Sequence, residues 1–336
     1  MLFMDKPLKY AVFGAGSWAT AIVKMLCENL DEIGWYMRSV YTKEHLLKEQ
    51  HNPSYLSSVE FNLDQLKISN DINEIANYAD VLIFVIPSAF MHSELEKLTT
   101  NIKNKIIVSA VKGIMPETGL LVGEHFHNIY NIPFDNIAVI AGPCHAEEVA
   151  LERLSYLTVS CSDAEKAQQI ANNLSSDYIK TKISDDIIGV EYAVMLKNIY
   201  AIAAGIAHGL GYGDNFQSVL MSNAIREMKR FIKKMHKMKR NINNSAYLGD
   251  LLVTAYSVFS RNRMFANMIG KGNTVKSAQM EMNMVAEGYY ATKSAFLLNE
   301  KNSKKTRLPI INAVYGILYE GKNPKKVFKK LTEKLD

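Results

Sequence analysis

The sequence predicts an α/β protein in which a doubly wound N-terminal domain is followed by an all-helical C-terminal domain. Its 336 residues exceed one hydrophobic core at typical domain sizes of roughly 100–200 residues, so two domains are expected. In the first half, short continuous apolar runs alternate with helical patterns, as in a parallel sheet covered on both faces. From about Asp185 long helical segments follow and convincing strands disappear. We therefore expect an α/β domain over residues 1–187 and a helical domain over residues 188–336.

The expected elements follow in chain order. Short apolar runs predict the strands, and apolar positions that recur every three or four residues predict the helices. The expected strands are Tyr10–Phe13, Ile33–Met37, Val81–Ile86, Ile106–Ser109, Ile137–Ile140 and Tyr156–Ser160. The expected helices include Trp18–Asn29, Ser88–Thr99, Asp163–Leu174 and Val190–Leu210.

Composition excludes several classes of protein. Apolar residues make up 48% and charged residues 22% of the chain, which is ordinary for a soluble globular protein. The three cysteines, Cys27, Cys144 and Cys161, form no Cys-x-x-Cys pair, so neither a disulfide framework nor a zinc module is expected. No apolar run approaches the roughly 18–20 residues of a spanning helix, and Asp5 and Lys6 interrupt the apolar start of the chain. We expect a cytoplasmic protein with no integral membrane segment and no metal site.

The net charge of +5 is concentrated in one segment. Residues 226–240 hold eight Lys or Arg and one Glu, so the rest of the chain sums to about −2. Met228, Phe231, Ile232 and Met235 recur at helical spacing, which predicts an amphipathic helix with a basic outer face. A solvated face is favoured over a membrane-surface or calmodulin-type role, and no nucleic-acid partner is expected. A second basic cluster, which we interpret in the same way, comprises Lys325, Lys326, Lys329, Lys330 and Lys334.

A glycine-rich turn follows the first expected strand and opens a helix. The segment GAGSWA has the form G-x-G-x-x-A, in which Gly14 permits the tight turn and Gly16 lets the backbone approach a pyrophosphate. Ala19 allows close packing of helix and strand, and the helix N-terminus supplies N–H groups to the phosphates. In this strand–turn–helix context the motif predicts dinucleotide binding.

The end of the second expected strand bears on which dinucleotide is used. An acidic residue there would bind the ribose 2′-hydroxyl of NAD, but the strand ends in Tyr36-Met37-Arg38-Ser39. Arg38 suits a 2′-phosphate, so NADP use is predicted. The alternative is that Arg38 is an ordinary surface arginine.

Further turns lie at the carboxyl edge of the expected sheet, where ligands of open α/β sheets bind. Lys112, after the strand that ends at Ser109, is a candidate site cation rather than an ordinary loop lysine. Cys144 and His145 follow another strand and suggest a thiol nucleophile. Adjacent residues seldom reach nucleophile–base geometry, however, so this interpretation is not favoured.

Lys197 is the candidate acid in the helical half. It shares a helix face with Val190 and with small residues such as Ala193 and Ala201, so its ammonium should be desolvated, and nearby cations would lower its pKa further. Such a group can protonate a carbonyl oxygen while hydride reaches carbon. The alternative is a lysine that extends from a packed helix to solvent.

The segment SRNR at residues 260–263 allows two interpretations. Ser260 could cap a helix that begins at Arg261. Arg261 and Asn262 could also bind a phosphate, because a guanidinium offers two donors and an amide adds a neutral one.

These motifs occur together in the order and spacing of the NAD(P)-dependent glycerol-3-phosphate dehydrogenases, a family that the chain resembles from about Tyr10 to Gly321. The resemblance rests on GAGSWA, VKG, GPxHAEEVA, LKNIYAIAAGIAHGLGYGDN, LGDLLVT, SRNR and AEG. It implies a Rossmann-type N-terminal domain, a helical substrate-binding and catalytic domain, and NAD or NADP as cofactor. The implied reaction is the reversible reduction of dihydroxyacetone phosphate to sn-glycerol 3-phosphate, which supplies phospholipid synthesis. A homodimer is compatible with the resemblance.

The resemblance also implies roles for individual residues. Lys197 is the implied acid–base catalyst, with Asp250 as its polar companion. The implied substrate-binding residues are Lys112, Gly142, Cys144, Lys197, Asp250, Ser260, Arg261 and Asn262. The implied cofactor-binding residues are Gly14, Gly16, Ser17, Trp18, Arg38, Tyr55, Lys112, Ala146, Arg261, Val285 and Glu287.

Two positions depart from the family pattern. Cys144 stands where serine is usual, and a thiol is a weak hydrogen-bond donor. Asn223 stands where many members carry arginine, so one expected cation is missing. Two other functions stay open: a reductase of another small keto acid or keto phosphate, which would not need SRNR, and a non-catalytic NADP sensor, which would lack a buried lysine–aspartate pair.

Overall fold

The chain forms two compact units. The computed structural model describes residues 7–282, 286–301 and 305–336. Unit 1 contains the chain as far as Val111, together with Val122–Ile140 and Cys144–Ile187. Unit 2 contains Ile188–Asp336 and two short segments from the first half of the sequence, Lys112–Leu121 and Ala141–Pro143.

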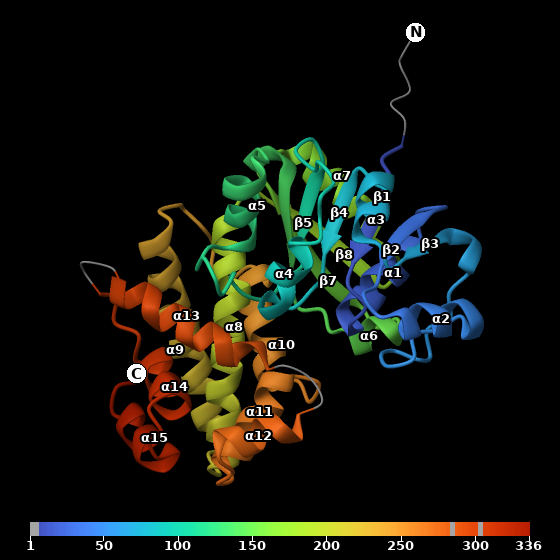
Figure 1. Ribbon diagram of the computed structural model, residues 1–336. Coiled ribbons are helices and arrows are strands. Elements are labelled where there is room, and N and C mark those ends of the chain that lie inside the picture. The colour runs from blue at the N-terminus through green and yellow to red at the C-terminus, as the bar shows by residue number, and fades with distance from the viewer. Residues whose placement is uncertain (1–6, 283–285, 302–304) are drawn as a thin grey trace. The chain divides into compact units, whose positions relative to one another are not determined.

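Unit 1 is built on one eight-stranded sheet (Figure 1). The strand order is β3-β2-β1-β4-β5-β6-β7-β8, and β1 pairs in parallel with both β2 and β4. The winding therefore reverses between β1 and β4, as in Rossmann-type sheets, and the predicted fold class is confirmed. The strands are β1 (Tyr10–Phe13), β2 (Ile33–Tyr36), β3 (Leu66–Ser69), β4 (Val81–Phe84), β5 (Ile106–Ser109), β6 (Ile137–Ala141), β7 (Ser155–Cys161) and β8 (Ile179–Ser184).

The inner strands are covered on both faces, which is why they are continuously apolar. Tyr10 and Val12 belong to the core cluster that includes the apolar side of α1, whereas Phe13 stacks on Phe84, which contacts Phe126 of α5. Alternate side chains of one strand thus enter different cores. The helices are α1 (Ser17–Cys27), α2 (Val40–Glu49), α3 (Ile72–Tyr78), α4 (Ser88–Leu95), α5 (Val122–Tyr130), α6 (Ala146–Ala150) and α7 (Ala164–Leu174). The predicted helix Ser88–Thr99 therefore ends four residues early.

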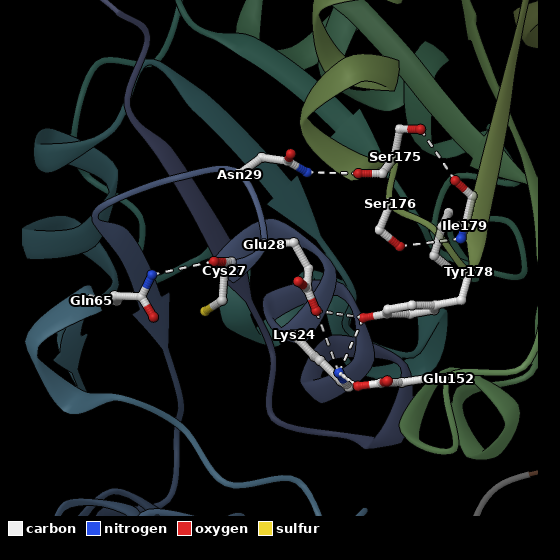
Figure 2. Close-up of polar contacts among 10 residues, drawn as sticks. All are labelled: Lys24, Cys27, Glu28, Asn29, Gln65, Glu152, Ser175, Ser176, Tyr178 and Ile179. Atoms are coloured by element: carbon white, nitrogen blue, oxygen red, sulfur yellow. Dashed lines mark hydrogen bonds and ion pairs between the residues drawn. The ribbon is translucent and has the colours of Figure 1, made fainter.

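Lys24, in the last turn of α1, fixes this helix to segments far along the chain (Figure 2). Its Nζ lies 2.8 Å from Glu152 Oε1 and donates a hydrogen bond to the Tyr178 hydroxyl at 3.1 Å. That hydroxyl donates in turn to Glu28 at 2.9 Å. Burial opposes the charge on Lys24, but its hydrogen bonds to Glu152 and Tyr178 outweigh burial and raise its pKa. The network holds the C-terminal end of the helix whose N-terminus is the candidate phosphate site.

Unit 2 is helical, with the long helix α8 (Ile187–Gly209) running through it (Figure 1). Among the described residues, α8 is the one helix long and apolar enough to cross a membrane, but 94% of its most apolar window is buried inside the protein. This burial is typical of the core helix of a globular protein. The other helices are α9 (Asp214–Met235), α10 (Asp250–Tyr256), α11 (Arg261–Gly270), α12 (Val275–Glu281), α13 (Glu287–Lys301), α14 (Pro309–Leu318) and α15 (Pro324–Thr332).

The predicted amphipathic helix is confirmed only as far as Met235. Met228, Phe231 and Ile232 are fully buried on the inner side of α9. The prediction was wrong for residues 236–240, because α9 ends at Met235 and His236 adopts an extended conformation.

Glycines bring α8 and α11 into backbone contact. A Cβ on Gly205 would lie 2.4 Å from the carbonyl oxygen of Arg263, and one on Gly209 would lie 2.4 Å from that of Asn267. A Cβ on Gly270 would in turn lie 2.5 Å from the carbonyl oxygen of Ile206. This glycine seam sets the position of α11 against the helix that carries Lys197.

Replacing Gly209 by alanine should therefore destabilise the protein. Overpacking costs typically 1–3 kcal/mol, and the clashing atoms here are backbone, which cannot rotate away. Chemical denaturation of the variant should show a loss of about that size in the free energy of unfolding. Gly213→Ala is the matched control, because a Cβ there meets nothing within 4 Å. Equal stability of the two variants would contradict the close approach of α8 and α11.

Candidate active site

The turn after β1 has the geometry that a dinucleotide phosphate requires. Gly14 has φ +128°, and a Cβ on it would lie 2.8 Å from the carbonyl oxygen of Val85, so only glycine fits. Gly16 precedes α1, and a Cβ on it would meet nothing within 4 Å. The first turn of α1 holds no acidic residue, so no carboxylate of this turn competes with a phosphate for the positive end of the helix. The residues present fit the pyrophosphate of NAD(P).

Asn52 holds this turn and was not predicted. Its side-chain amide donates hydrogen bonds of 3.0 Å to the Ala15 carbonyl and to the Thr20 hydroxyl. Its carbonyl oxygen accepts from the backbone N–H groups of Ser54 and Tyr55. One fully buried amide therefore connects the phosphate turn to the loop that carries Tyr55, a candidate cofactor contact.

Arg38 lies just after β2, and its side chain is 65% exposed. Its Nη1 is 3.5 Å from Oε1 of Glu94, a buried carboxylate of α4 that also accepts from the Tyr36 hydroxyl at 2.6 Å and from Lys97 at 2.8 Å. Burial opposes ionisation of Glu94, but its bonds to Lys97 and Tyr36 outweigh burial and lower its pKa. The sequence places no carboxylate at the tip of β2, whereas folding brings the carboxylate of Glu94 next to Arg38 from α4.

The other cofactor candidates in unit 1 lie near helix starts. Ser17, the first residue of α1, is buried and Trp18 is half-buried. Ala146 is the first residue of α6, and half-buried Cys144 lies in the turn before it. Val285, predicted to contact the nicotinamide, lies outside the described residues.

Lys197 and Asp250 form a buried ion pair in unit 2. Lys197 Nζ donates to Asp250 Oδ1, and their side chains are 7% and 2% exposed. Asp250 Oδ2 accepts from the backbone N–H of Gly142 at 3.3 Å. The structure thus brings together three candidates that are far apart in the sequence. A buried charge needs such a partner, and here each charge has one.

Local structure explains how Asp250 reaches this position. Ser245–Gly249 forms a π-helical turn that leads directly into α10, whose first residue is Asp250. A Cβ on Gly249 would lie 3.4 Å from the ring of Pro143, so the turn packs against the residue that follows Gly142. Gly142 has φ +136°, which glycine adopts readily.

A chain of side-chain amides connects four segments of unit 2. Asn198 donates to the carbonyl of Lys112 at 3.3 Å and accepts from the Asn262 amide at 2.9 Å. The Asn262 carbonyl oxygen accepts from the backbone N–H of Gly288 at 2.9 Å. Asn198 was not predicted. Among the described residues, Asn262 uses one of its two amide hydrogens and its carbonyl oxygen here, so the other hydrogen can serve a ligand.

Lys112 lies among other charges. Burial and the nearby Lys197 ammonium lower the pKa of Lys112 to about 8, with Arg261 adding to the effect and Glu287 and Asp250 opposing it. Three cations thus face two carboxylates, which leaves the cluster attractive to an anion. The sequence predicted Lys112 as a site cation but gave no sign of its lowered pKa.

The SRNR segment has a structural role at its first residue. Ser260 caps α11, since its Oγ accepts from the backbone N–H of Arg263 at 3.4 Å. Half-buried Arg261 opens the helix and is close enough to influence Lys112. The cap and a phosphate contact are compatible, because they involve different side chains.

Asn223, where an arginine is usual, belongs to a different part of unit 2. It donates to the backbone carbonyl of Asp336 at 2.8 Å and accepts from Arg226 at 2.8 Å. Arg226 also pairs with the Asp336 carboxylate at 2.7 Å. Asn223 therefore binds the C-terminal residue in this structure.

Comparison with known proteins identifies related chains. Family models described as the N-terminus and the C-terminus of NAD-dependent glycerol-3-phosphate dehydrogenase match residues 9–167 and 186–329. A glycerol-3-phosphate dehydrogenase [NAD(P)+] of Exiguobacterium sp. is 33% identical over 96% of this chain and 94% of its own length. One of Latilactobacillus sakei is 34% identical over 93% and 92%. The crystal structure of glycerol-3-phosphate dehydrogenase from Coxiella burnetii has a TM-score of 0.88 at 27% identity, and covers 97% of this chain and 99% of its own.

Proposed function

The chain belongs to the NAD-dependent glycerol-3-phosphate dehydrogenase family, and we propose that its catalysis depends on the buried pair of Lys197 and Asp250. The protein is an oxidoreductase that reduces dihydroxyacetone phosphate with NADH or NADPH to sn-glycerol 3-phosphate. Phospholipid synthesis draws on this product. The observation that supports this catalytic role is the burial of an ammonium and a carboxylate together, beside the backbone N–H of Gly142.

Bound NAD(P)H supplies the hydride that reaches the ketone carbon of the substrate. Lys197 Nζ donates a proton to the ketone oxygen, which becomes the hydroxyl of the product. Asp250 orients the Lys197 ammonium, and the Gly142 N–H in turn orients Asp250. After the transfer Lys197 is neutral and must take a proton from solvent before the next turnover.

The substrate phosphate is held by the cationic part of the same cluster. Arg261 offers paired donors, the remaining Asn262 amide hydrogen offers a neutral one, and Lys112 adds charge. Binding energy from this remote group holds the ketone in place for the transfer. Cys144 and Ser260 complete the proposed substrate contacts, and Glu287 is proposed to contact the nicotinamide.

Substrate capture should weaken in mildly alkaline solution. Lys112 carries its charge below its lowered pKa of about 8, so kcat/KM for dihydroxyacetone phosphate should fall as the pH rises through that value. A guanidinium stays charged throughout this range. In Lys112→Arg the fall should therefore move to higher pH, as measured by initial rates from about pH 6 to 10. The same profile in both proteins would remove Lys112 from the phosphate site.

Arg38 is proposed to bind the 2′-phosphate of NADPH. Arg38→Ala should weaken the binding of NADPH by about 1–3 kcal/mol, which is the value of a hydrogen bond between charged groups. It should weaken the binding of NADH much less. Titration of both reduced cofactors into both proteins measures this. Lys43→Ala is a control, since it removes a half-buried cation of α2 that forms no ion pair with Glu94. An equal loss of affinity for NADPH and NADH in Arg38→Ala would exclude this role of Arg38.

The overall activity has a direct test. The protein, NADPH and dihydroxyacetone phosphate are mixed, and the absorbance of reduced nicotinamide should fall only when all three are present. Absence of turnover with either reduced cofactor would contradict the assignment. We also propose a cytoplasmic location and a homodimer. Cell fractionation and light scattering test them.

A further inference from the structure

A pocket of about 510 Å³ lies between α14 and α15 in unit 2, and it shares no residue with the proposed active site. These two helices pack against each other and are drawn in red in Figure 1. The volume is within the range of small-molecule sites, which run from roughly 300 to 1,000 Å³. The function proposed above leaves this pocket unused.

The floor of the pocket is apolar. Ala313 of α14 and Leu331 of α15 are buried, and Pro309 and Val327 are half-buried beside them. Gly316 also lines the pocket, and a Cβ on it would lie 3.1 Å from Cδ of Lys322, so the aliphatic stem of that lysine extends the apolar surface. This floor can bury a short hydrocarbon chain.

The rim of the pocket is basic. The lining includes Lys322, Lys326, Lys330 and Lys334, all of which are exposed, and it includes no aspartate or glutamate among the residues that the structure describes. Their spacing of four places them along one side of α15 and its flanks, where like charges repel and destabilise a helix. Lys322 pairs with Glu320, whereas no carboxylate in the described part of the chain pairs with the other three lysines. An anion bound at the rim would relieve this repulsion.

We propose that this pocket binds a small anionic amphiphile, namely a phosphate monoester attached to a short alkyl or acyl chain. The phosphate lies at the rim among Lys326, Lys330 and Lys334, and the chain covers the floor formed by Ala313 and Leu331. A lysine ammonium is a good phosphate partner, and the apolar floor beside it accounts for the chain. A hollow of this size suits one molecule, whereas a flat membrane would contact all the lysines of α15, including those outside the pocket.

Calorimetric titration of the full chain with octyl phosphate tests the proposal. The titrations stay below the micelle concentration and contain sn-glycerol 3-phosphate and reduced cofactor, which cannot react with each other, so that the active site is occupied without turnover. Inorganic phosphate provides the head group alone, and octyl glucoside provides the chain without charge. Octyl phosphate should bind about tenfold or more tightly than either. Equal affinity for inorganic phosphate, or no octyl phosphate binding at all, would overturn the proposal.

Two double variants separate the pocket from the general charge of α15. K326Q/K330Q removes two lysines that line the pocket, and K325Q/K329Q removes two exposed lysines of the same helix that do not. Both variants lose the same charge. K326Q/K330Q should lower the affinity for octyl phosphate about tenfold or more, and K325Q/K329Q should lower it by less than about threefold. An equal loss of affinity in the two variants would mean that octyl phosphate is attracted to a basic surface, and it would refute binding in the pocket. Unchanged dehydrogenase activity of both variants verifies that they are folded.

Discussion

Replacing Lys197 by methionine is expected to lower kcat about 10²–10⁴-fold, the usual contribution of a general acid. Methionine roughly preserves the bulk of the side chain, so the loss reports the ammonium. NADPH affinity should change little, because the candidate residues for the phosphates and the adenosine ribose belong to unit 1 and Lys197 belongs to unit 2. Steady-state rates and a cofactor titration measure the two quantities.

This variant needs a control for stability, because Asp250 would be left buried without its cation. Breaking a buried pair in this way typically costs about 3–5 kcal/mol. The double variant K197M/D250N removes both charges and should recover much of that stability while its turnover stays low. Near-normal turnover in either variant would exclude Lys197 as the proton donor.

Replacing Arg261 by alanine is expected to lower kcat/KM for dihydroxyacetone phosphate about 30- to 1,000-fold, or about 2–4 kcal/mol. The reason is the loss of a charge-assisted contact to the phosphate. Dihydroxyacetone without its phosphate should be a very poor substrate of the unmodified protein. Arg261→Ala should reduce that residual activity much less, since no phosphate is present to lose its partner.

Arg263→Ala is the matched control, because it removes the same type of side chain from the same segment and helix. The ratio of kcat/KM for dihydroxyacetone phosphate to kcat/KM for dihydroxyacetone should stay near that of the unmodified protein. If Arg261→Ala lowers both activities by one factor, Arg261 is structural or serves only the cofactor. Lys112 is then the next candidate for the phosphate.

The fold could be predicted from the sequence where strands are buried on both faces, and not at the edges of the sheet. The two strands that were missed, β3 and β8, are the two edge strands. Their residues are mostly exposed or half-exposed, and Lys67, Lys180 and Lys182 interrupt their apolar pattern. Edge strands commonly carry such charges, because they discourage pairing with another chain. A search for continuous apolar runs therefore finds the interior of a parallel sheet and misses its borders.

The candidate site shows a similar division. Gly14 and Gly16 are identified by a local pattern, because one turn and one helix start create their function. Asn52, Glu94 and Asn198 act through partners that are far away in the sequence, as in the 56 residues that separate Glu94 from Arg38. A single asparagine or glutamate carries no local sign of such a partner. Position beside Lys197 was the one available signal for Asn198.

The division of the chain between the units has a consequence for its synthesis on the ribosome. Lys112 and Gly142 are translated among the strands of unit 1, but both belong to unit 2. Domains generally fold as units in order of translation. Unit 1 can therefore fold before α8 and α10, the helices that contact these two segments, have left the ribosome. Unit 2 thus folds late, and it combines segments that are synthesised with unit 1 and the helices that are synthesised afterwards. A gene fragment that begins at Ile188 would encode Lys197 and Asp250 without the backbone N–H group that binds the aspartate.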